Sequence, residues 1–228
     1  MACRQCEGIE AFFDDGVARR ELRRYRRKGV GGTTRILLEA LRSPSAGTGV
    51  AGRSFLDIGG GVGAIQHELM AAGATHGTHA DASPAYLDAA RSEGERRGHA
   101  DRVRYVLGDF VDVADDIEPA DVVTLDRVVC CYPDMPALVD ASASRALESY
   151  GLVFPRVTPL TRVAFRILNL VQTLRRHPFH VFLHDTRSVE ARVKRHGLHR
   201  IYHRETFFWQ VMVFQRTSGG ARPQPTHA

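Results

Sequence analysis

A glycine-rich turn between an apolar strand and a helix constrains the fold of this chain most strongly. In FLDIGGGVGAIQHEL an apolar run ends at Asp57, the glycines Gly59, Gly61 and Gly63 follow, and a helical pattern begins. Glycine lets the backbone turn tightly and lets a ligand approach without a clash against Cβ. The helix N-terminus offers N–H groups that have no partner inside the helix. This arrangement predicts an α/β fold with a ligand-binding turn.

Glycine turns of this kind serve more than one class of ligand. Gly59, Gly61 and Ala64 also satisfy the dinucleotide pattern G-x-G-x-x-G/A. A phosphate-cradling P-loop is excluded, because no Lys-Ser/Thr pair follows the glycines. Asp57 favours S-adenosylmethionine (SAM) over NAD, because a carboxylate suits a ligand with an ammonium and a sulfonium and repels a pyrophosphate.

Two further acids end the next two predicted strands. Asp81 follows the glycines at the distance expected of a ribose-binding acid, a feature that SAM and NAD sites share. Asp109 ends the third strand, where its carboxylate can accept from an adenine amino group while Phe110 lies alongside the ring. The joint spacing of these acids and the glycines predicts a SAM site.

The segment PLTRVAFRILNLVQTLRR, residues 159–176, predicts an amphipathic helix. Arg162, Arg166 and Asn169 lie off its apolar stripe. We expect the stripe to pack on the protein's own core; covering a substrate pocket or touching a membrane surface is the alternative. The stripe consists of Leu160, Val163, Ala164, Ile167, Leu168, Val171 and Leu174.

The motifs DIGGGVG, DAS, GDF and LDRV, spread over residues 55–128, resemble the cofactor motifs of class I SAM-dependent methyltransferases. The resemblance implies a Rossmann-like, doubly wound seven-stranded sheet with an antiparallel last strand, in agreement with the alternation of strands and helices. It implies that Asp57 and the glycines cradle the amino-acid part of SAM, that Asp81 with Ala82 holds the ribose and that Asp109 contacts adenine. More narrowly, LDRVVCCYPD, YGLVFPR and WQVMVFQR are similar to the magnesium-protoporphyrin O-methyltransferase-like branch.

The sequence pattern divides the chain into three parts. Residues 1–42 are an N-terminal helical cap with a basic helix, residues 43–217 the SAM-dependent methyltransferase domain, and residues 218–228 a disordered tail. Arg19 to Lys28 carries seven basic residues and one acid, so it does not read as a simple amphipathic core helix. It is either a solvated helix or a basic collar for an anionic substrate or nucleic acid.

The stretch LDRVVCCYPD leaves the fourth strand at the carboxyl edge of the sheet, where ligands bind in open α/β folds. We therefore expect Asp126 and Arg127 to border the cofactor and Tyr132 to face the acceptor. Tyr132 and His184 are the candidate catalytic residues. Cys130 and Cys131 are expected to diverge and to fill space as small apolar groups.

No metal site is predicted. Cys3 and Cys6 form a C-x-x-C pair, but no second pair completes the four ligands of a structural zinc site. The apolar runs are too short to span a membrane and the N-terminus lacks a signal pattern, so a cytoplasmic protein is expected. The sequence carries no signal for a particular oligomeric state.

The sequence thus predicts a SAM-dependent methyltransferase that acts on a small-molecule acceptor, at oxygen, and an anionic acceptor is compatible with the basic helix. The alternatives are methylation of RNA or a protein, with nucleic acid the less favoured partner, and a nucleotide-binding module of the same fold without turnover.

Overall fold

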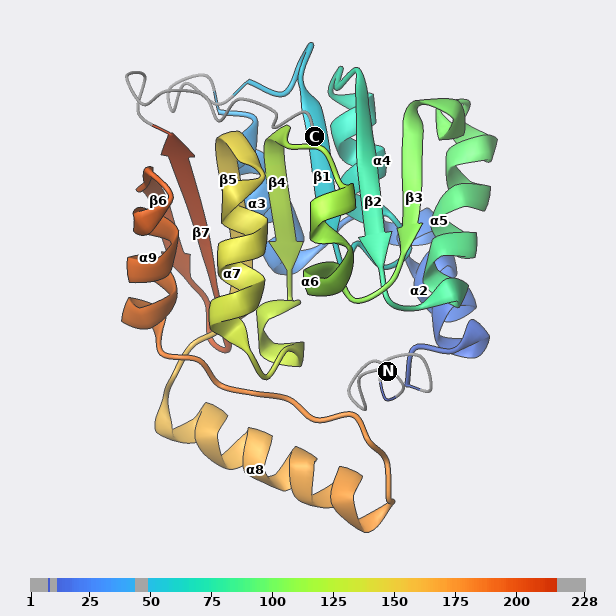
Figure 1. Cartoon of the computed structure of the whole chain (residues 1–228). Coiled ribbons are helices and arrows are strands. Elements are labelled where there is room, and N and C mark those ends of the chain that lie inside the picture. Colours follow the sequence, from blue (N-terminus) through green and yellow to red (C-terminus); the bar gives the residue numbers. More distant parts are fainter. Residues whose placement is uncertain (1–7, 9–11, 44–48, 217–228) are drawn as a thin grey trace.

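The computed structural model describes residues 8, 12–43 and 49–216, and its centre is a seven-stranded sheet (Figure 1). The strand order is β3-β2-β1-β4-β5-β7-β6. The first five strands are parallel, and β7 runs antiparallel to both β5 and β6. The predicted fold class is confirmed. The strands are β1 Ser54–Ile58, β2 His76–Asp81, β3 Val103–Leu107, β4 Ala120–Asp126, β5 Ala146–Pro155, β6 Leu198–Glu205 and β7 Trp209–Arg216.

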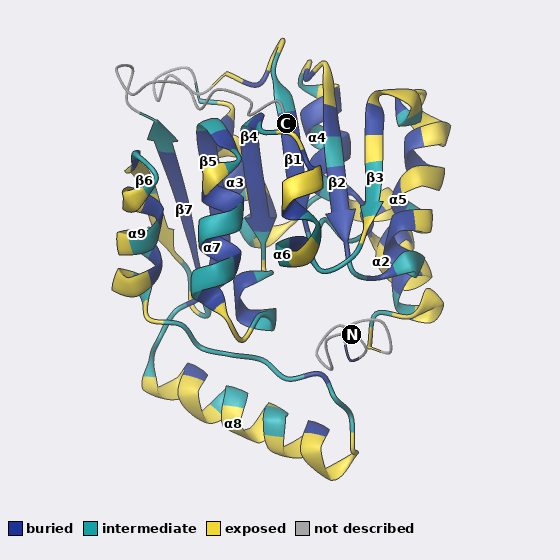
Figure 2. Ribbon diagram, in the orientation of Figure 1, coloured by how far each residue is buried: buried dark blue, intermediate teal, exposed yellow. Residues whose placement is uncertain are grey.

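Helices cover both faces of this sheet. Leu37 and Leu69 pack on one face from α3 and α4, and Leu138 and Val189 pack on the other from α7 and α9. The central strands are therefore buried on both sides (Figure 2), as expected of a parallel sheet. The helices are α2 Asp15–Lys28, α3 Gly32–Leu41, α4 Ala64–Ala71, α5 Pro84–Arg97, α6 Phe110–Val113, α7 Met135–Ser144, α8 Pro159–Leu174 and α9 Thr186–Arg195; three short 3₁₀ turns are η2 Ala100–Arg102, η3 Ala114–Asp116 and η4 Val129–Cys131.

The basic helix α2 has a narrow buried stripe, which the sequence analysis missed. Ala18, Leu22 and Tyr25 are buried, and their cluster includes Tyr86 of α5. Arg26 donates to the buried carboxylate of Glu93 on α5 at 2.8 Å. The basic residues of α2 led us to expect that the helix does not pack through an apolar face, and this expectation was wrong. Three apolar residues at helical spacing are enough to dock α2 on α5. The next helix, α3, packs directly on β5 and β7.

The amphipathic helix forms as predicted, but its apolar stripe does not pack on the core. Figure 1 shows α8 beyond the carboxyl ends of the parallel strands, apart from the layers around the sheet, and Figure 2 shows it largely exposed. Ile167 is 58% exposed and Leu174 is 74% exposed. The buried side chains of α8 are Thr161 and Gln172. The expected core packing was therefore wrong: the helix turns a polar side toward the protein.

Two predictions fall outside the described residues, namely the C-x-x-C pair of Cys3 and Cys6 and the disordered tail. Within the described residues, no group of three or more His, Cys, Asp and Glu side chains is placed to hold a metal ion. No helix in the same part of the chain has the length and apolarity needed to cross a bilayer.

Candidate functional site

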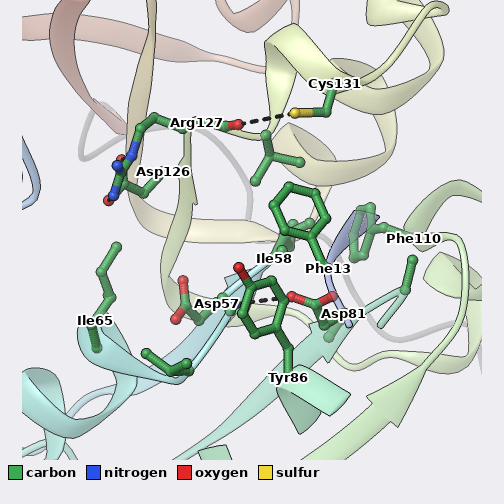
Figure 3. A pocket seen from close by; sticks show the side chains of 18 of the residues that line it. Phe13, Asp57, Ile58, Ile65, Asp81, Tyr86, Phe110, Asp126, Arg127 and Cys131 are labelled. Carbon is green, nitrogen blue, oxygen red and sulfur yellow. Dashed lines mark hydrogen bonds and ion pairs between the residues drawn. The ribbon is translucent and has the colours of Figure 1, made fainter. Parts of the chain in front are cut away.

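A cavity of about 340 Å³ opens where β1, β2 and β4 end, at the carboxyl edge of the sheet. Figure 3 shows its acidic and aromatic side chains around one space. The cavity brings together most of the predicted site residues, while Gly63 and His184 are absent from its wall. The predicted residues that line it are Asp57, Gly59, Gly61, Asp81, Ala82, Asp109, Phe110, Asp126, Arg127 and Tyr132.

The glycine turn has the geometry that its sequence predicts. Gly59 has φ 59°, and a Cβ there would lie 2.5 Å from Cγ2 of Val128, so no side chain fits. Gly61 has φ 57°, and nothing lies within 4 Å of its Cβ position. The turn is thus closed on the Val128 side and open at Gly61, where a ligand can approach the backbone.

Asp57 is fully buried at the base of this turn. One carboxylate oxygen accepts from Thr124 Oγ1 at 2.8 Å, and the other, Oδ2, has no hydrogen-bond partner. Burial raises the pKa of Asp57 from 3.8 to about 7. Beside it, His79 is paired in register with Asp57 across β1 and β2, and neither of its ring nitrogens has a partner. An unsatisfied buried carboxylate oxygen costs free energy, and a cation bound next to it would remove that cost.

Asp81 joins the glycine turn to the end of β2. Its Oδ2 accepts from the backbone N–H of Gly61 at 2.9 Å, and its Oδ1 accepts from that of Ser83 at 2.8 Å. Burial raises the pKa of Asp81 to about 6. Each carboxylate oxygen has a second lone pair, so Asp81 can brace the turn and still accept from a hydroxyl in the cavity.

Asp109 and Tyr132 meet on the wall of the cavity. The Tyr132 hydroxyl donates to the two carboxylate oxygens of Asp109 at 3.0 and 3.1 Å. Asp109 also caps α6 by accepting from the Val111 N–H at 3.1 Å, and Phe110 follows it with its side chain buried against the cavity. A carboxylate and an aromatic side chain therefore stand side by side, as the sequence predicts for an adenine site.

Asp126 and Arg127 form the rim after β4. Thr34 Oγ1 donates to Asp126 Oδ2 at 2.5 Å, and Arg127 Nε lies 3.1 Å from Asp126 Oδ1. Arg127 takes a left-handed conformation with φ 64°. Its backbone N–H donates to the Val153 carbonyl at 2.8 Å, which holds this sparsely populated conformation in place.

The charges of the cavity wall are strongly unequal. Five carboxylates line it, from Glu21, Asp57, Asp81, Asp109 and Asp126, against one cationic side chain, Arg127. Among the described residues, the basic side chains of α2 do not line the cavity. A wall of this kind favours a ligand with positive charge over a dinucleotide, whose pyrophosphate it would repel.

The comparisons with known proteins agree with this geometry. Residues 55–151 match the family model of a methyltransferase domain. A methyltransferase domain therefore spans residues 55–151 of this chain. This match confirms the enzyme class that the sequence motifs predict. No curated protein matches the sequence.

Solved structures share the fold of this methyltransferase at low sequence identity. Magnesium protoporphyrin IX methyltransferase from Synechocystis PCC 6803, with bound S-adenosylhomocysteine, has a TM-score of 0.71 at 17% identity, over 93% of this chain and 100% of that chain. The same enzyme with bound SAM has a TM-score of 0.69 at 16% identity, over 95% and 99% of the two chains. An O-methyltransferase family protein from Burkholderia thailandensis has a TM-score of 0.61 at 21% identity, over 82% and 59%.

The methyltransferase cavity also has lining residues that the sequence analysis did not identify. Phe13, Glu21 and Thr34 reach it from the N-terminal segment, and Tyr86 from α5. Tyr86 donates to Glu21 at 2.9 Å. No motif marks these residues, because they reach the site through the docking of α2 and α3. Apolar residues at helical spacing on α2 were the one signal that could have indicated this docking.

Two predictions about side chains near the methyltransferase rim need correction. His184 does not line the cavity; its Nε2 donates to the Tyr132 carbonyl at 2.9 Å instead. Cys130 and Cys131 do not diverge, because they sit in the 3₁₀ turn η4 with their sulfur atoms 3.9 Å apart. The Cys131 thiol and burial hold the pKa of Cys130 well above its usual range, which disfavours a nucleophilic thiolate.

Proposed function

We propose that this methyltransferase binds SAM in the cavity at the carboxyl edge of the sheet and methylates a small molecule at oxygen. The observation that carries the cofactor site is the buried, unpartnered Oδ2 of Asp57 in an acidic cavity. The ammonium and sulfonium of SAM supply the positive charge that this oxygen lacks.

The other wall residues suit the remaining parts of SAM. Gly61 leaves the backbone open to the amino-acid part, and Asp81 has lone pairs free for ribose hydroxyls. Asp109 and Phe110 offer an acceptor and an aromatic face for adenine. Asp126 and Arg127, at the end of β4, border the cofactor.

The cover of the cavity favours a small acceptor. Phe13, Glu21 and Thr34 cover it from the N-terminal segment, which leaves less room for a folded protein or an RNA duplex. The support for oxygen is the name of one similar solved structure, an O-methyltransferase family protein.

SAM supplies a methyl group that is already activated by the sulfonium, so the protein mainly positions the reactants and excludes water. Tyr132 is the proposed acceptor-side residue. Its hydroxyl donates to Asp109, so its position is fixed relative to the adenine site. Arg127 is the one cationic side chain on the described wall, and we propose that it meets an acidic group of the acceptor in addition to its ion pair with Asp126. An acidic hydroxyl or carboxylate acceptor needs no strong general base.

Calorimetry with S-adenosylhomocysteine tests the proposal. We expect the wild-type protein to bind it and Asp57→Asn to weaken binding by a factor on the order of 30 to 1,000, because a buried charge partner is lost. Asp88→Asn, at an exposed position on α5, is the matched control and should bind like the wild type. Methyl transfer from labelled SAM to small molecules of a cell extract then identifies the acceptor.

Binding of NADH without heat from S-adenosylhomocysteine would refute the cofactor assignment. Equal affinities of Asp57→Asn and the wild type would refute the role of that carboxylate. Label that appears in RNA or protein, and not in small molecules, would overturn the acceptor class while leaving the cofactor site intact.

A further inference from the structure

A charged arm leaves the sheet after β5 and returns at α9; we define it as residues 156–184, made of α8 and the segment that follows it. It contains five arginines and three histidines, and no Asp or Glu. Arg162, Arg166, Arg175 and Arg176 are exposed, and none of their guanidinium groups has an ion-pair partner among the described residues. The arm is thus a positively charged surface without internal neutralisation.

The polar side of α8 faces the rest of the protein and forms hydrogen bonds with the segment that follows the helix. Asn169 donates to the Val181 carbonyl at 2.8 Å and accepts from the Val181 N–H at 2.9 Å. The returning segment is fixed in turn, because the Phe182 N–H donates to the Cys130 carbonyl at 2.7 Å. Turning the apolar stripe toward the cavity would break the Asn169 pair, so the stripe is not poised to cover the site.

The apolar stripe lies on the side of α8 that the protein leaves open. At 100° per residue, one stripe gathers six large apolar side chains, each more than a third exposed. Arg162 and Arg166 flank one edge of it, and Arg175 flanks the other. Long arginine side chains beside an apolar stripe can reach lipid phosphates while the stripe enters the acyl region. These six side chains are Leu160, Val163, Ile167, Leu170, Val171 and Leu174. Compared with the stripe predicted from the sequence, they include Leu170 and leave out Ala164 and Leu168.

We propose that α8 is a docking surface for an anionic lipid bilayer, and that the enzyme binds such a surface with its α8 stripe in the headgroup region. The positive charge of the arm favours an anionic bilayer over a second copy of the chain. Four unpaired arginines complement anionic headgroups, whereas two copies of this arm placed face to face would set like charges together with no acid to compensate. The proposal goes beyond the methyltransferase activity and does not depend on SAM binding.

The surface lies next to the site. The returning segment of the arm bonds to η4 through Phe182 and His184, and η4 leads into Tyr132 on the cavity wall. At the far end of the arm, Phe179 packs on Phe12 and Phe13 with ring centroids 4.8 and 5.6 Å apart, and Phe13 lines the cavity. A bilayer bound at α8 would therefore lie at the carboxyl edge of the sheet, where the cavity opens.

Vesicle flotation without any cofactor tests the proposal. We expect the full chain to float with vesicles of phosphatidylcholine and phosphatidylglycerol and to bind vesicles of phosphatidylcholine alone much more weakly. Ile167→Glu/Leu170→Glu should lower the partition coefficient by roughly a hundredfold, because two side chains that are 58% and 59% exposed in the free protein no longer enter the bilayer. Both positions are exposed, so the fold should be retained, as checked by circular dichroism.

Matched control variants show whether vesicle binding depends on the arm itself or on the overall charge and hydrophobicity of the protein. Leu107→Glu/Ile201→Glu changes the charge equally at two exposed apolar positions on the edge strands and should leave binding unchanged. Arg162→Gln/Arg166→Gln should weaken binding to the anionic vesicles by about thirtyfold. Arg23→Gln/Arg27→Gln removes two exposed arginines from α2 and should have a much smaller effect.

Three outcomes would overturn the proposal. The wild-type protein could bind neither kind of vesicle. The α2 pair could matter more than the α8 pair, which would assign the lipid contact to the basic helix. A concentration-dependent dimer that Ile167→Glu/Leu170→Glu dissolves, without vesicle binding, would assign the stripe to a second copy of the chain.

Discussion

The cavity and the α8 arm lie at the same edge of the molecule but have opposite character. The cavity wall carries five carboxylates and one arginine, and its central acid, Asp57, is fully buried. The arm carries arginine and histidine without any acid and exposes its apolar residues. Buried unpartnered charge indicates a ligand that enters the protein, whereas exposed apolar surface beside unpaired charge indicates a large surface that the protein approaches.

The largest expected effect comes from a Leu→Ala substitution made once in the core of the sheet and once in the arm. Leu152→Ala in β5, where the side chain is fully buried, should lower the free energy of unfolding by about 2–5 kcal/mol. Leu170→Ala in α8, where it is 59% exposed, should change it by less than about 0.5 kcal/mol. Chemical denaturation of both variants measures the difference. A loss at Leu170 similar to that at Leu152 would mean that the stripe packs on the core in solution.

A second comparison concerns the two sides of the glycine turn. Gly59→Ala and Gly61→Ala share the cost of a positive φ, but the first also places Cβ against Val128. The free energy of unfolding of Gly59→Ala should be lower than that of Gly61→Ala by roughly 1–3 kcal/mol. The double variant Gly59→Ala/Val128→Ala should recover most of that difference, because the clash with Val128 is removed. Thermal unfolding is the measurement. Equal melting temperatures for the two single variants would show that the turn relaxes away from Val128.

The pH dependence of the free enzyme follows from Asp57. Its pKa is about 7 in the folded protein against 3.8 ordinarily, so between about pH 4 and 7 the folded state holds a proton that the unfolded state has released. Stability therefore falls as pH rises through this window, and Asp81 acts in the same direction. Asp57→Asn should be more stable than the wild type at pH 8 by roughly 1–3 kcal/mol, although it binds the cofactor poorly.

Cofactor affinity should follow the opposite trend. S-adenosylhomocysteine should bind more tightly as pH rises from 6 to 8, because its ammonium pairs with the ionised form of Asp57, whose pKa is about 7. Calorimetry at several pH values with Asp57→Asn as the control checks this. If the affinity of the wild type does not change between pH 6 and 8, the ammonium does not pair with Asp57.

The smallest expected effect separates the acceptor side from the cofactor side. Tyr132→Phe removes the hydroxyl that donates to Asp109. If Tyr132 faces the acceptor, kcat should fall by about tenfold while affinity for S-adenosylhomocysteine changes little. A lower affinity for S-adenosylhomocysteine with an unchanged kcat would instead mean that Tyr132 positions Asp109 in the adenine site.

The sequence by itself determined most of the acidic wall of the cavity. The carboxyl ends of parallel strands share one edge of the sheet, so acids at the ends of β1, β2 and β4 and glycines in the first turn had to meet there. Strand ends and glycine turns are local features, and local periodicity predicts them. The antiparallel last strand was implied by the resemblance to class I methyltransferases, and β7 does pair antiparallel with both β5 and β6.

Only the tertiary structure decided which long-range partners complete the site and which way α8 faces. Phe13, Glu21 and Thr34 reach the cavity because α2 docks on α5 and α3 on the sheet. The helical spacing of apolar residues on α2 indicates a docking face but does not specify the element on which the helix docks. The apolar stripe of α8 has the same pattern whether it faces a core or solvent. Its orientation depends on the Asn169 bonds to Val181, a pair twelve residues apart that forms only when the arm folds back.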